Sequence, residues 1–490
     1  MNQYIGIDLG TSAVKLLLVN EDGVIAGEQS RGYDVVYPRE GWSEQSPADW
    51  WDAVADGMRA LLAGTDAKRV KGLAVAGQMH GLVTLDADDN VIRPAILWND
   101  GRTQRQTDRL NTEIGKAQLS AWTANIAFAG FTAPKLLWMR ENEPENFERI
   151  AKIMLPKDYI VYKLTGEHAT DCSDASGTLF FDVKNRRWSR EMTDVCRIRE
   201  SQLPRVCESE APVGTLLPEI AARFGLSPDT VVAAGAGDNA AAAVGTGTVT
   251  DGACNISLGT SGTVFIASDT FTVDPANALH SFDHAGGKYH LMGCILSAAS
   301  CNKWFCEDIL GRTDFGAVQA EIDAERLGRN SVMFLPYLMG ERSPVNDADA
   351  RGAFVGLSAG ASRADLMQAV LEGVAFALRD CLEVAWTQGV DVRRSTVCGG
   401  GAKSDLWLRI LADVTGLTLV KPVTEQGPGY GAAMLAMTAT GAYASVADCA
   451  AAIVRTGEVI APDPAVKALY DEKFGIYKRI YPALKMLEKK

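Results

Sequence analysis

Long apolar runs are absent from this 490-residue sequence, which nowhere approaches the roughly 18 uninterrupted apolar residues that a membrane span requires. Positive charge is also in deficit. Lys and Arg total 48 against 61 Asp and Glu, a net charge of −13. This balance argues against a nucleic-acid partner, which normally needs a basic face. The N-terminus carries neither a positively charged segment nor a cleavage site, so we expect a cytoplasmic protein.

Paired cysteines are lacking as well. Ten cysteines are scattered through the chain and none forms a Cys-x-x-Cys pair. Ten in this length are too dilute for a disulfide scaffold, and metal-ligand spacing is absent, so we expect small core residues rather than a zinc site. The remaining composition, 47% hydrophobic and 22% charged, is ordinary for a globular protein, and the length allows two to four domains.

An internal repeat reduces that number to two. Ile7 and residues 9–12 (Leu-Gly-Thr-Ser) recur 249 positions later, as Ile256 and residues 258–261. After each copy the pattern predicts further strands, then a helix. Three strands and a helix open a ribonuclease H-like unit, and we therefore predict an α/β fold of two duplicated ribonuclease H-like domains with a cleft between them. We place the domains at 1–245 and 246–442, followed by a helical tail at 443–490.

The two Leu-Gly-Thr-Ser turns are suited to phosphate. A tight turn of glycine and hydroxyl residues gathers backbone N–H groups and Oγ donors in a concave cluster. A plain hairpin turn would explain one copy. Two copies at the heads of duplicated domains favour a pair of facing turns that hold a polyphosphate from both sides.

Asp8 lies just before the first turn, and its counterpart in the second copy is Ser257. The hairpin itself therefore does not require the carboxylate. We predict that Asp8 holds Mg²⁺, through water, beside the phosphates. The alternative is a hydrogen-bonded turn aspartate.

Asp238 follows a Gly-Ala-Gly strand end and precedes an alanine-rich helix. One interpretation is a helix N-cap, which Asp makes well. The other is a general base that accepts the proton of an attacking hydroxyl, since the glycines admit a ligand and phosphoryl transfer needs little beyond positioning and charge neutralisation. The spacing alone does not decide between them.

Polar residues follow other predicted strands too. Gln78 and His80 end one strand, and the cluster at 98–102 ends another, where hydroxyls of a ligand could be bound. A structural histidine is the alternative for His80. Gly399–Gly401 with Ser404 could enclose an adenosine, although a helix-entry turn explains them equally. Neither a dinucleotide fingerprint nor a Walker A motif occurs.

Together these residues resemble the FGGY family of carbohydrate kinases, within the actin-like ATPase superfamily. The resemblance extends to about residue 440. Two long signatures carry it: residues 130–139, which read Gly-Phe-Thr-Ala-Pro-Lys-Leu-Leu-Trp-Met, and residues 352–372, with Gly352–Leu357 and Ala369–Glu372 at their ends. The pattern typical of glycerol-phosphorylating members is missing, because Arg102 is followed by Thr103 rather than by Glu.

The resemblance implies transfer of the ATP γ-phosphoryl group, with Mg²⁺, to a sugar bound on the first domain while ATP binds on the second. It is strongest with members that phosphorylate D-xylulose at the 5-hydroxyl. Another sugar or polyol, such as ribulose, gluconate or glycerol, is the alternative, and an actin-like ATPase that is not a kinase is a more distant one. Relatives are often dimers, so a homodimer is also an expectation.

The resemblance and the strand-end positions together define the predicted site. Asp238 is the expected catalytic base and Asp8 the expected magnesium-side residue. The expected sugar-binding residues are Gln78, Met79, His80, Trp98, Asn99, Asp100, Arg102 and Asn239. The expected nucleotide-binding residues are Thr11, Ser12, Lys15, Gly259, Thr260, Gly400, Gly401 and Ser404.

Overall fold

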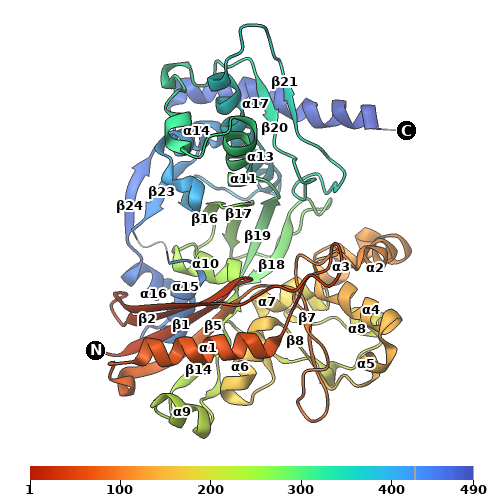
Figure 1. Cartoon of the computed structure of the whole chain (residues 1–490), viewed down its shortest axis with the longest axis vertical. Coiled ribbons are helices and arrows are strands. Elements are labelled where there is room, and N and C mark those ends of the chain that lie inside the picture. Colours follow the sequence, from red (N-terminus) through yellow and green to blue (C-terminus); the bar gives the residue numbers. More distant parts are fainter. Residues whose placement is uncertain (424–425, 489–490) are drawn as a thin grey trace.

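The computed structural model describes residues 1–423 and 426–488, which form two mixed sheets with helices packed around them (Figure 1). The order of strands in the first sheet is β13-β14-β5-β1-β2-β3, with β15 paired to β5. Its strands are β1 (Gln3–Leu9), β2 (Ala13–Asn20), β3 (Ile25–Gly32), β5 (Val70–Gly77), β13 (Pro212–Thr215), β14 (Val231–Ala233) and β15 (Ala236–Gly237).

The second sheet repeats this topology. Its order is β18-β19-β17-β16-β22-β23-β24. Its strands are β16 (Cys254–Leu258), β17 (Gly262–Ser268), β18 (His280–His284), β19 (Lys288–Ile295), β22 (Arg394–Cys398), β23 (Thr418–Pro422) and β24 (Thr456–Ile460). In each sheet an antiparallel hairpin, β1–β2 or β16–β17, adjoins a parallel strand, β5 or β22. The predicted α/β fold of two duplicated units is confirmed.

Helices and short strands fill the connections. The helices of the first half are α1 (Pro47–Leu62), α2 (Gln104–Arg109), α3 (Lys116–Thr123), α4 (Thr132–Asn142), α5 (Pro144–Glu148), α6 (Pro156–Thr165), α7 (Cys172–Ala175), α8 (Arg190–Cys196), α9 (Pro218–Phe224) and α10 (Asp238–Gly245). Those of the second half are α11 (Ala299–Trp304), α12 (Phe315–Gln319), α13 (Arg363–Thr387), α14 (Asp405–Thr415), α15 (Gly427–Ala439), α16 (Val446–Ile453) and α17 (Pro464–Glu488). The short strands are β4 (Glu44–Gln45), β6 (Val83–Leu85), β7 (Ala95–Ile96), β8 (Lys152–Met154), β9 (Ala169–Asp171), β10 (Phe181–Asp182), β11 (Arg187–Trp188), β12 (Arg205–Cys207), β20 (Met333–Leu335) and β21 (Ala353–Val355).

Two sequence-based expectations differ from the structure in detail. The strand expected to end just before Asp238 is divided into β14 and β15. Gly235 interrupts it with a φ of +79°, and a Cβ there would lie 1.9 Å from the Val75 carbonyl oxygen, so only glycine is accommodated. The tail after residue 443, expected to be helical, also contributes β24, which pairs with β23 at the edge of the second sheet.

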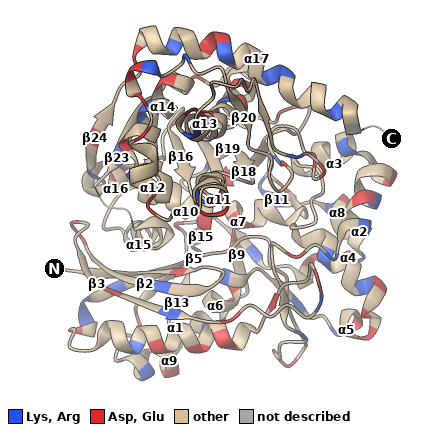
Figure 2. Cartoon of the chain, turned by 45° about the horizontal axis from the view of Figure 1, so that its top comes forward, with Lys and Arg blue, Asp and Glu red and all other residues tan. Residues whose placement is uncertain are grey.

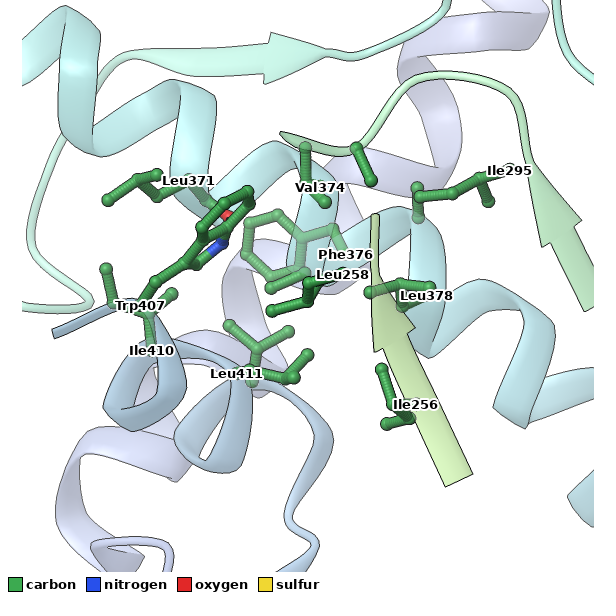
Figure 3. Close-up of a cluster of buried hydrophobic side chains, with 14 of the residues drawn as sticks. Ile256, Leu258, Ile295, Leu371, Val374, Phe376, Leu378, Trp407, Ile410 and Leu411 are labelled. Carbon is green, nitrogen blue, oxygen red and sulfur yellow. The ribbon is translucent and has the colours of Figure 1, made fainter. Parts of the chain in front are cut away.

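The second half has its core around α13 and α14 (Figure 3). A capping box of Ser362 and Asp365 starts α13, which is buried from Met367 to Leu382 except at Asp380. Trp407 of α14 lies against α13 and donates its indole N–H to the Leu371 carbonyl at 3.1 Å. Ile256 and Leu258 of β16 pack onto the same cluster. This core holds the glycine turns of the second sheet in place.

Helices α10 and α15 lie between the two sheets (Figure 1). Both belong to one buried cluster with side chains of β1, β2 and β5. Gly6 of β1 lies so close to α15 that a Cβ at this position would be 1.8 Å from the Gly429 carbonyl oxygen. Helix α15, expected within the second domain, thus packs on the first sheet, and the domain boundaries stay predictions.

Charge is distributed over both halves, with acidic and basic segments interspersed (Figure 2). Eight of the ten cysteines are buried, the exceptions being Cys294 and Cys398. Among the described residues, no helix is both long and apolar enough to cross a membrane.

Candidate active site

The site residues of the first half gather where three parallel strands end. Leu9 of β1, Gly77 of β5 and Gly237 of β15 lie in one row across the sheet. Asp8 is one residue before that row, whereas Gln78 and Asp238 are one residue after it. The carboxyl ends of parallel strands are where α/β proteins bind ligands, because the connections diverge there. Residues 230 positions apart therefore meet at one edge of the sheet.

Asp8 and Asp238 interact electrostatically. Burial, reinforced by the negative charge of Asp238 and opposed by Lys15, raises the pKa of Asp8 to about 7. Burial also raises the pKa of Asp238 to about 6, although the Asn239 N–H favours its ionised form. Two half-buried carboxyl groups of high pKa at a strand-end site are typical of groups that bind a cation or transfer a proton.

Asp238 is the first residue of α10, and Gly237 is the N-cap. The side chain is therefore one position beyond a capping role, and its Oδ1 accepts the Asn239 N–H at 2.7 Å. The Asn239 amide in turn lies 3.9 Å from Met79 Sδ. The structure thus brings Asp238, Asn239 and Met79 together, as the sequence predicts.

Thr11 contacts two of the residues predicted to bind the sugar. Its hydroxyl donates to Gln78 Oε1 at 3.1 Å and accepts the Trp98 indole N–H at 3.0 Å. Gln78 also donates to Gln45, whose own amide binds the Thr11 carbonyl at 2.6 Å. The Thr11 hydroxyl thus holds the Gln78 and Trp98 side chains, and its contact with the nucleotide stays a prediction. Gln45 completes this network and was not among the predicted residues.

His80 has an unusual backbone and a fixed ring. Its φ of +70° lies in the left-handed region, which is strained for a residue with a Cβ and is typical of functional sites. The ring stacks on Phe131 with centroids 4.7 Å apart, and Nδ1 lies 2.8 Å from the Gly177 carbonyl. A carbonyl only accepts, so Nδ1 carries the proton. Burial, and then the charge of Lys135, lowers the pKa of His80 to about 3. The ring is therefore neutral, with Nε2 as a hydrogen-bond acceptor.

Residues of the signature at 130–139 hold the His80 backbone in place. Lys135 is fully buried and donates to the His80 carbonyl at 2.8 Å and to the Gly130 carbonyl. Thr132 donates to the same His80 oxygen at 3.1 Å. Burial lowers the pKa of Lys135 to about 7. These contacts compensate for the strained backbone, and no local pattern in the sequence points to them.

Asp100 and Arg102 bind each other. The Arg102 guanidinium is fully buried, donates to both Asp100 oxygens at 2.7 to 3.0 Å, and lies 3.7 Å from the Trp42 ring centroid. Asp100 also accepts the Ser43 N–H at 2.6 Å. Both side chains thus have partners within the protein, whereas Asn99 and Trp98 are exposed beside them. The sequence did not show which of these side chains are paired within the protein and which are exposed to a ligand.

The glycine turns of the second half surround a cavity of about 740 Å³. It is lined by four of the predicted nucleotide residues, Thr260, Gly400, Gly401 and Ser404. Gly259, the fifth predicted residue here, directly precedes Thr260 of this lining, and a Cβ on Gly399 would approach its nitrogen to 2.9 Å.

Side chains not predicted from the sequence close this cavity. Gln319 accepts the Ser404 hydroxyl at 2.5 Å and donates to Asn302 at 3.2 Å, while Phe315 and Lys303 line the wall. These side chains belong to α11 and α12. Both helices are far in sequence from the glycine turn at 399–401, so no local pattern links them to it. A volume of this size accommodates a nucleoside.

Ser12 and Lys15 lie on the first hairpin, away from this cavity. Lys15 is opposite Asp8 in the β1–β2 ladder. Its ammonium binds Gln426 just before α15, and Glu28 at 3.1 Å. Ser12 is exposed.

The donor chemistry at Asp8 fits a hydrated magnesium ion. The Asp8 carboxylate makes no hydrogen bond to any described residue, and a second carboxylate is close enough to raise its pKa. The described residues contain no cluster of three His, Cys, Asp or Glu side chains able to hold a metal alone. Mg²⁺ commonly takes one or two carboxylates and completes its shell with water and phosphate.

Duplicated sheets with acidic residues at the strand ends of one, and a nucleoside-sized cavity below the glycine turns of the other, define a phosphotransferase of actin-like architecture. The chain belongs to the FGGY family of carbohydrate kinases. The N-terminal domain of that family matches residues 3–245 and its C-terminal domain matches residues 254–440.

Individual relatives are similar over the full length. The xylulose kinase of Escherichia coli (strain K12) is 42% identical over 483 residues, which are 98% of this chain and 99% of the relative. A crystal structure described as a xyloylose kinase from Brucella ovis is 42% identical, with a TM-score of 0.95 over 99% of this chain and 100% of that one. A gluconate kinase from Lactobacillus acidophilus has a TM-score of 0.93 at 27% identity, over 99% and 98% of the two chains. The fold alone therefore does not select the sugar.

Proposed function

We propose that the protein transfers the γ-phosphoryl group of ATP to the 5-hydroxyl of D-xylulose. The carrying observation is the full-length identity of 42% to a xylulose kinase, together with the meeting of Asp8 and Asp238 at one sheet edge. Kinases of other sugars share this fold. The assignment of D-xylulose as substrate is therefore based on sequence identity and on the residues around Asp238, and not on the fold.

Asp238 is the general base in this proposal. Its carboxylate lies at the N-terminus of α10, where one oxygen is held by the Asn239 N–H and the other is left to accept a proton. Removal of the hydroxyl proton as the oxygen attacks the γ-phosphorus raises the nucleophilicity of that oxygen. The pKa of about 6 leaves the base mostly ionised at neutral pH.

The sugar is bound by residues on either side of the base. The neutral His80 ring presents Nε2 as an acceptor for a hydroxyl, and the Asn239 amide supplies both a donor and an acceptor. Trp98, 42% exposed and tethered through its indole N–H, offers an apolar face to the sugar carbons. Buried polar groups of this kind discriminate against sugars that lack the matching hydroxyl.

ATP occupies the cavity of the second half, with its adenosine near Gly400, Gly401 and Gln319. Asp8 would hold Mg²⁺, and Lys15, opposite it on the neighbouring strand, would balance part of the phosphate charge. When bound, Mg²⁺ neutralises charge on the transferring phosphoryl group. A homodimer, a cytoplasmic location and the lack of a nucleic-acid partner remain predictions.

A coupled ADP-release assay over D-xylulose, D-ribulose, D-gluconate and glycerol tests the proposal. We expect the highest kcat/KM with D-xylulose and phosphorus–proton NMR coupling at C5 of the product. A higher kcat/KM with another sugar would replace the substrate but keep the kinase. ADP release that no sugar stimulates would leave the alternative of an ATPase that is not a kinase.

A further inference from the structure

A buried charged cluster lies behind the sheet edge that carries the site. Lys157 on α6 is fully buried, as are the carboxyl groups of Asp158, Asp171 and Asp174 around it. The ammonium lies 2.8 Å from Asp158, 2.9 Å from Asp171 and 3.9 Å from Asp174. Burial alone would lower the pKa of Lys157, but these carboxylates raise it above its ordinary value.

Such a cluster is expensive to bury. Ion pairs removed from water recover their desolvation cost only with excellent geometry, and apolar replacements are often as stable. Both Asp174 oxygens are buried without a hydrogen-bond partner among the described residues. Stability therefore does not account for the cluster, and its contacts with the site suggest another use.

The cluster reaches the catalytic turn through one hydroxyl. Asp171 Oδ2 accepts the Ser173 hydroxyl, and the Ser173 Oγ in turn accepts the Gly237 N–H at 3.1 Å. Gly237 is the N-cap of α10 and directly precedes Asp238. On its other side, Lys157 donates to the Ala234 carbonyl at 3.3 Å. Both ends of the segment 234–237, which leads to Asp238, are thus held by the cluster.

This backbone needs such support because its own residues cannot provide it. Residues 235 and 237 are both glycines, which have the widest conformational freedom and no side chain to pack. Gly235 N–H donates to the Ser209 carbonyl at 3.0 Å, and Ser209 also donates its hydroxyl to Asp171 at 2.7 Å. A Cβ on Gly237 would lie 3.0 Å from Met79, so a side chain at this position would require Met79 to shift.

We propose that Ser173, held by the Asp171–Lys157 pair, is a positioning residue that sets the orientation of Asp238 toward the sugar hydroxyl. The inference rests on the proposed role of Asp238 as the base. Small displacements of a reacting group cost large factors in rate while leaving binding of the substrate nearly intact, because the binding contacts lie elsewhere.

Ser173→Ala tests this. Its N–H contact to Asp171 remains, and the hydroxyl that accepts from Gly237 is lost. We expect kcat for D-xylulose to fall by about tenfold or more, with KM for sugar and for ATP unchanged within about threefold. Ser173→Thr, which keeps a hydroxyl, should recover most of the lost kcat and also covers the case in which Ser173→Ala folds poorly.

Two matched variants separate positioning from general stability. Ser209→Ala removes a hydroxyl from the same Asp171 oxygen but keeps the Gly237 bond. Ser189→Ala removes a buried hydroxyl that caps α8, elsewhere in the first half. Both should lower the unfolding temperature at least as much as Ser173→Ala while retaining kcat near the wild-type value.

The outcomes are distinguishable. Wild-type kcat in Ser173→Ala, or equal losses of kcat in all three alanine variants, overturns the positioning role. If Asp238→Asn keeps wild-type turnover, the base itself is wrongly assigned and the inference falls with it. If Asp238→Asn is inactive and Ser173→Ala is fully active, the proposed function stands and only the inference fails.

Discussion

Asp8 and Asp238, from opposite ends of the first half of the chain, meet at one edge of the sheet, where the negative charge of Asp238 acts on Asp8. Burial together with the charge of Asp238 raises the pKa of Asp8 to about 7, and burial raises that of Asp238 to about 6. Carboxyl groups with raised pKa values are suited to bind a cation or to accept a proton. The predictions below follow from this pair and from the contacts around it.

Replacement of Asp238 by Asn should lower kcat by about 100-fold or more, since general-base catalysis contributes a factor of that size. Asn keeps an oxygen for the Asn239 N–H, so the fold and the KM for D-xylulose should change little. Steady-state kinetics measure this, with the exposed Asp229→Asn as control. Near wild-type turnover would reduce Asp238 to a residue of the helix terminus.

The rate should depend on pH through the same carboxyl group. Because burial raises the pKa of Asp238 to about 6, the base is protonated below that pH. At saturating Mg²⁺, kcat/KM for the sugar should fall by about tenfold per pH unit below pH 6 and level off above pH 7. Measurement from pH 5 to 8 with a stable coupling system checks this. A flat profile down to pH 5 contradicts it.

Asp8→Asn should raise the Mg²⁺ concentration needed for half-maximal activity at least several-fold, at fixed total ATP, because one of the charged oxygen ligands is lost. Sugar binding measured without nucleotide should be unaffected. In the wild type the half-saturating Mg²⁺ concentration should also fall as the pH rises through about 7, where Asp8 ionises. An unchanged Mg²⁺ requirement in the variant removes Asp8 from the metal site.

Lys135 connects stability to the sugar site. Its folded pKa, lowered to about 7 by burial, is below the ordinary value, so between pH 7 and about 10 the unfolded chain binds more protons than the folded one. The free energy of unfolding should therefore rise with pH across this window. In Lys135→Met this rise should be smaller than in the wild type. Denaturant titrations at pH 7 and 9 measure the difference.

The same variant loses the donor to the His80 carbonyl, so KM for the sugar should also rise. The exposed Lys116→Met serves as control for both readouts. Equal pH dependence in Lys135→Met and wild type, or an unchanged KM, would contradict the supporting role of Lys135.

Gly400→Val should act on the nucleotide alone. A Cβ at Gly400 meets nothing within 4 Å and projects beside the 740 Å³ cavity, so the fold should tolerate the change while the new side chain occupies nucleotide space. We expect KM for ATP to rise at least several-fold with KM for the sugar unchanged. Gly360→Val, exposed and similarly unobstructed, should leave both values as they are.

Much of the fold and part of the site could be predicted from the chain itself. The repeat of Leu-Gly-Thr-Ser after 249 residues and the period of the apolar positions indicated two like sheets, because hairpins and amphipathic helices are encoded locally. Asp8 and Asp238 stood out because each is a carboxylate beside a glycine-rich strand end. Their roles at the metal and as the base stay predictions.

Only the tertiary structure decided which partners each side chain has. It paired Thr11 with Gln78 and Trp98, joined Asp100 to Arg102, placed Lys135 under His80, and linked Ser173 to the turn before Asp238. Each of these except the Asp100–Arg102 pair spans more than fifty residues of sequence. Sequence patterns report which face of an element is apolar, whereas a hydrogen bond between distant elements depends on how they pack.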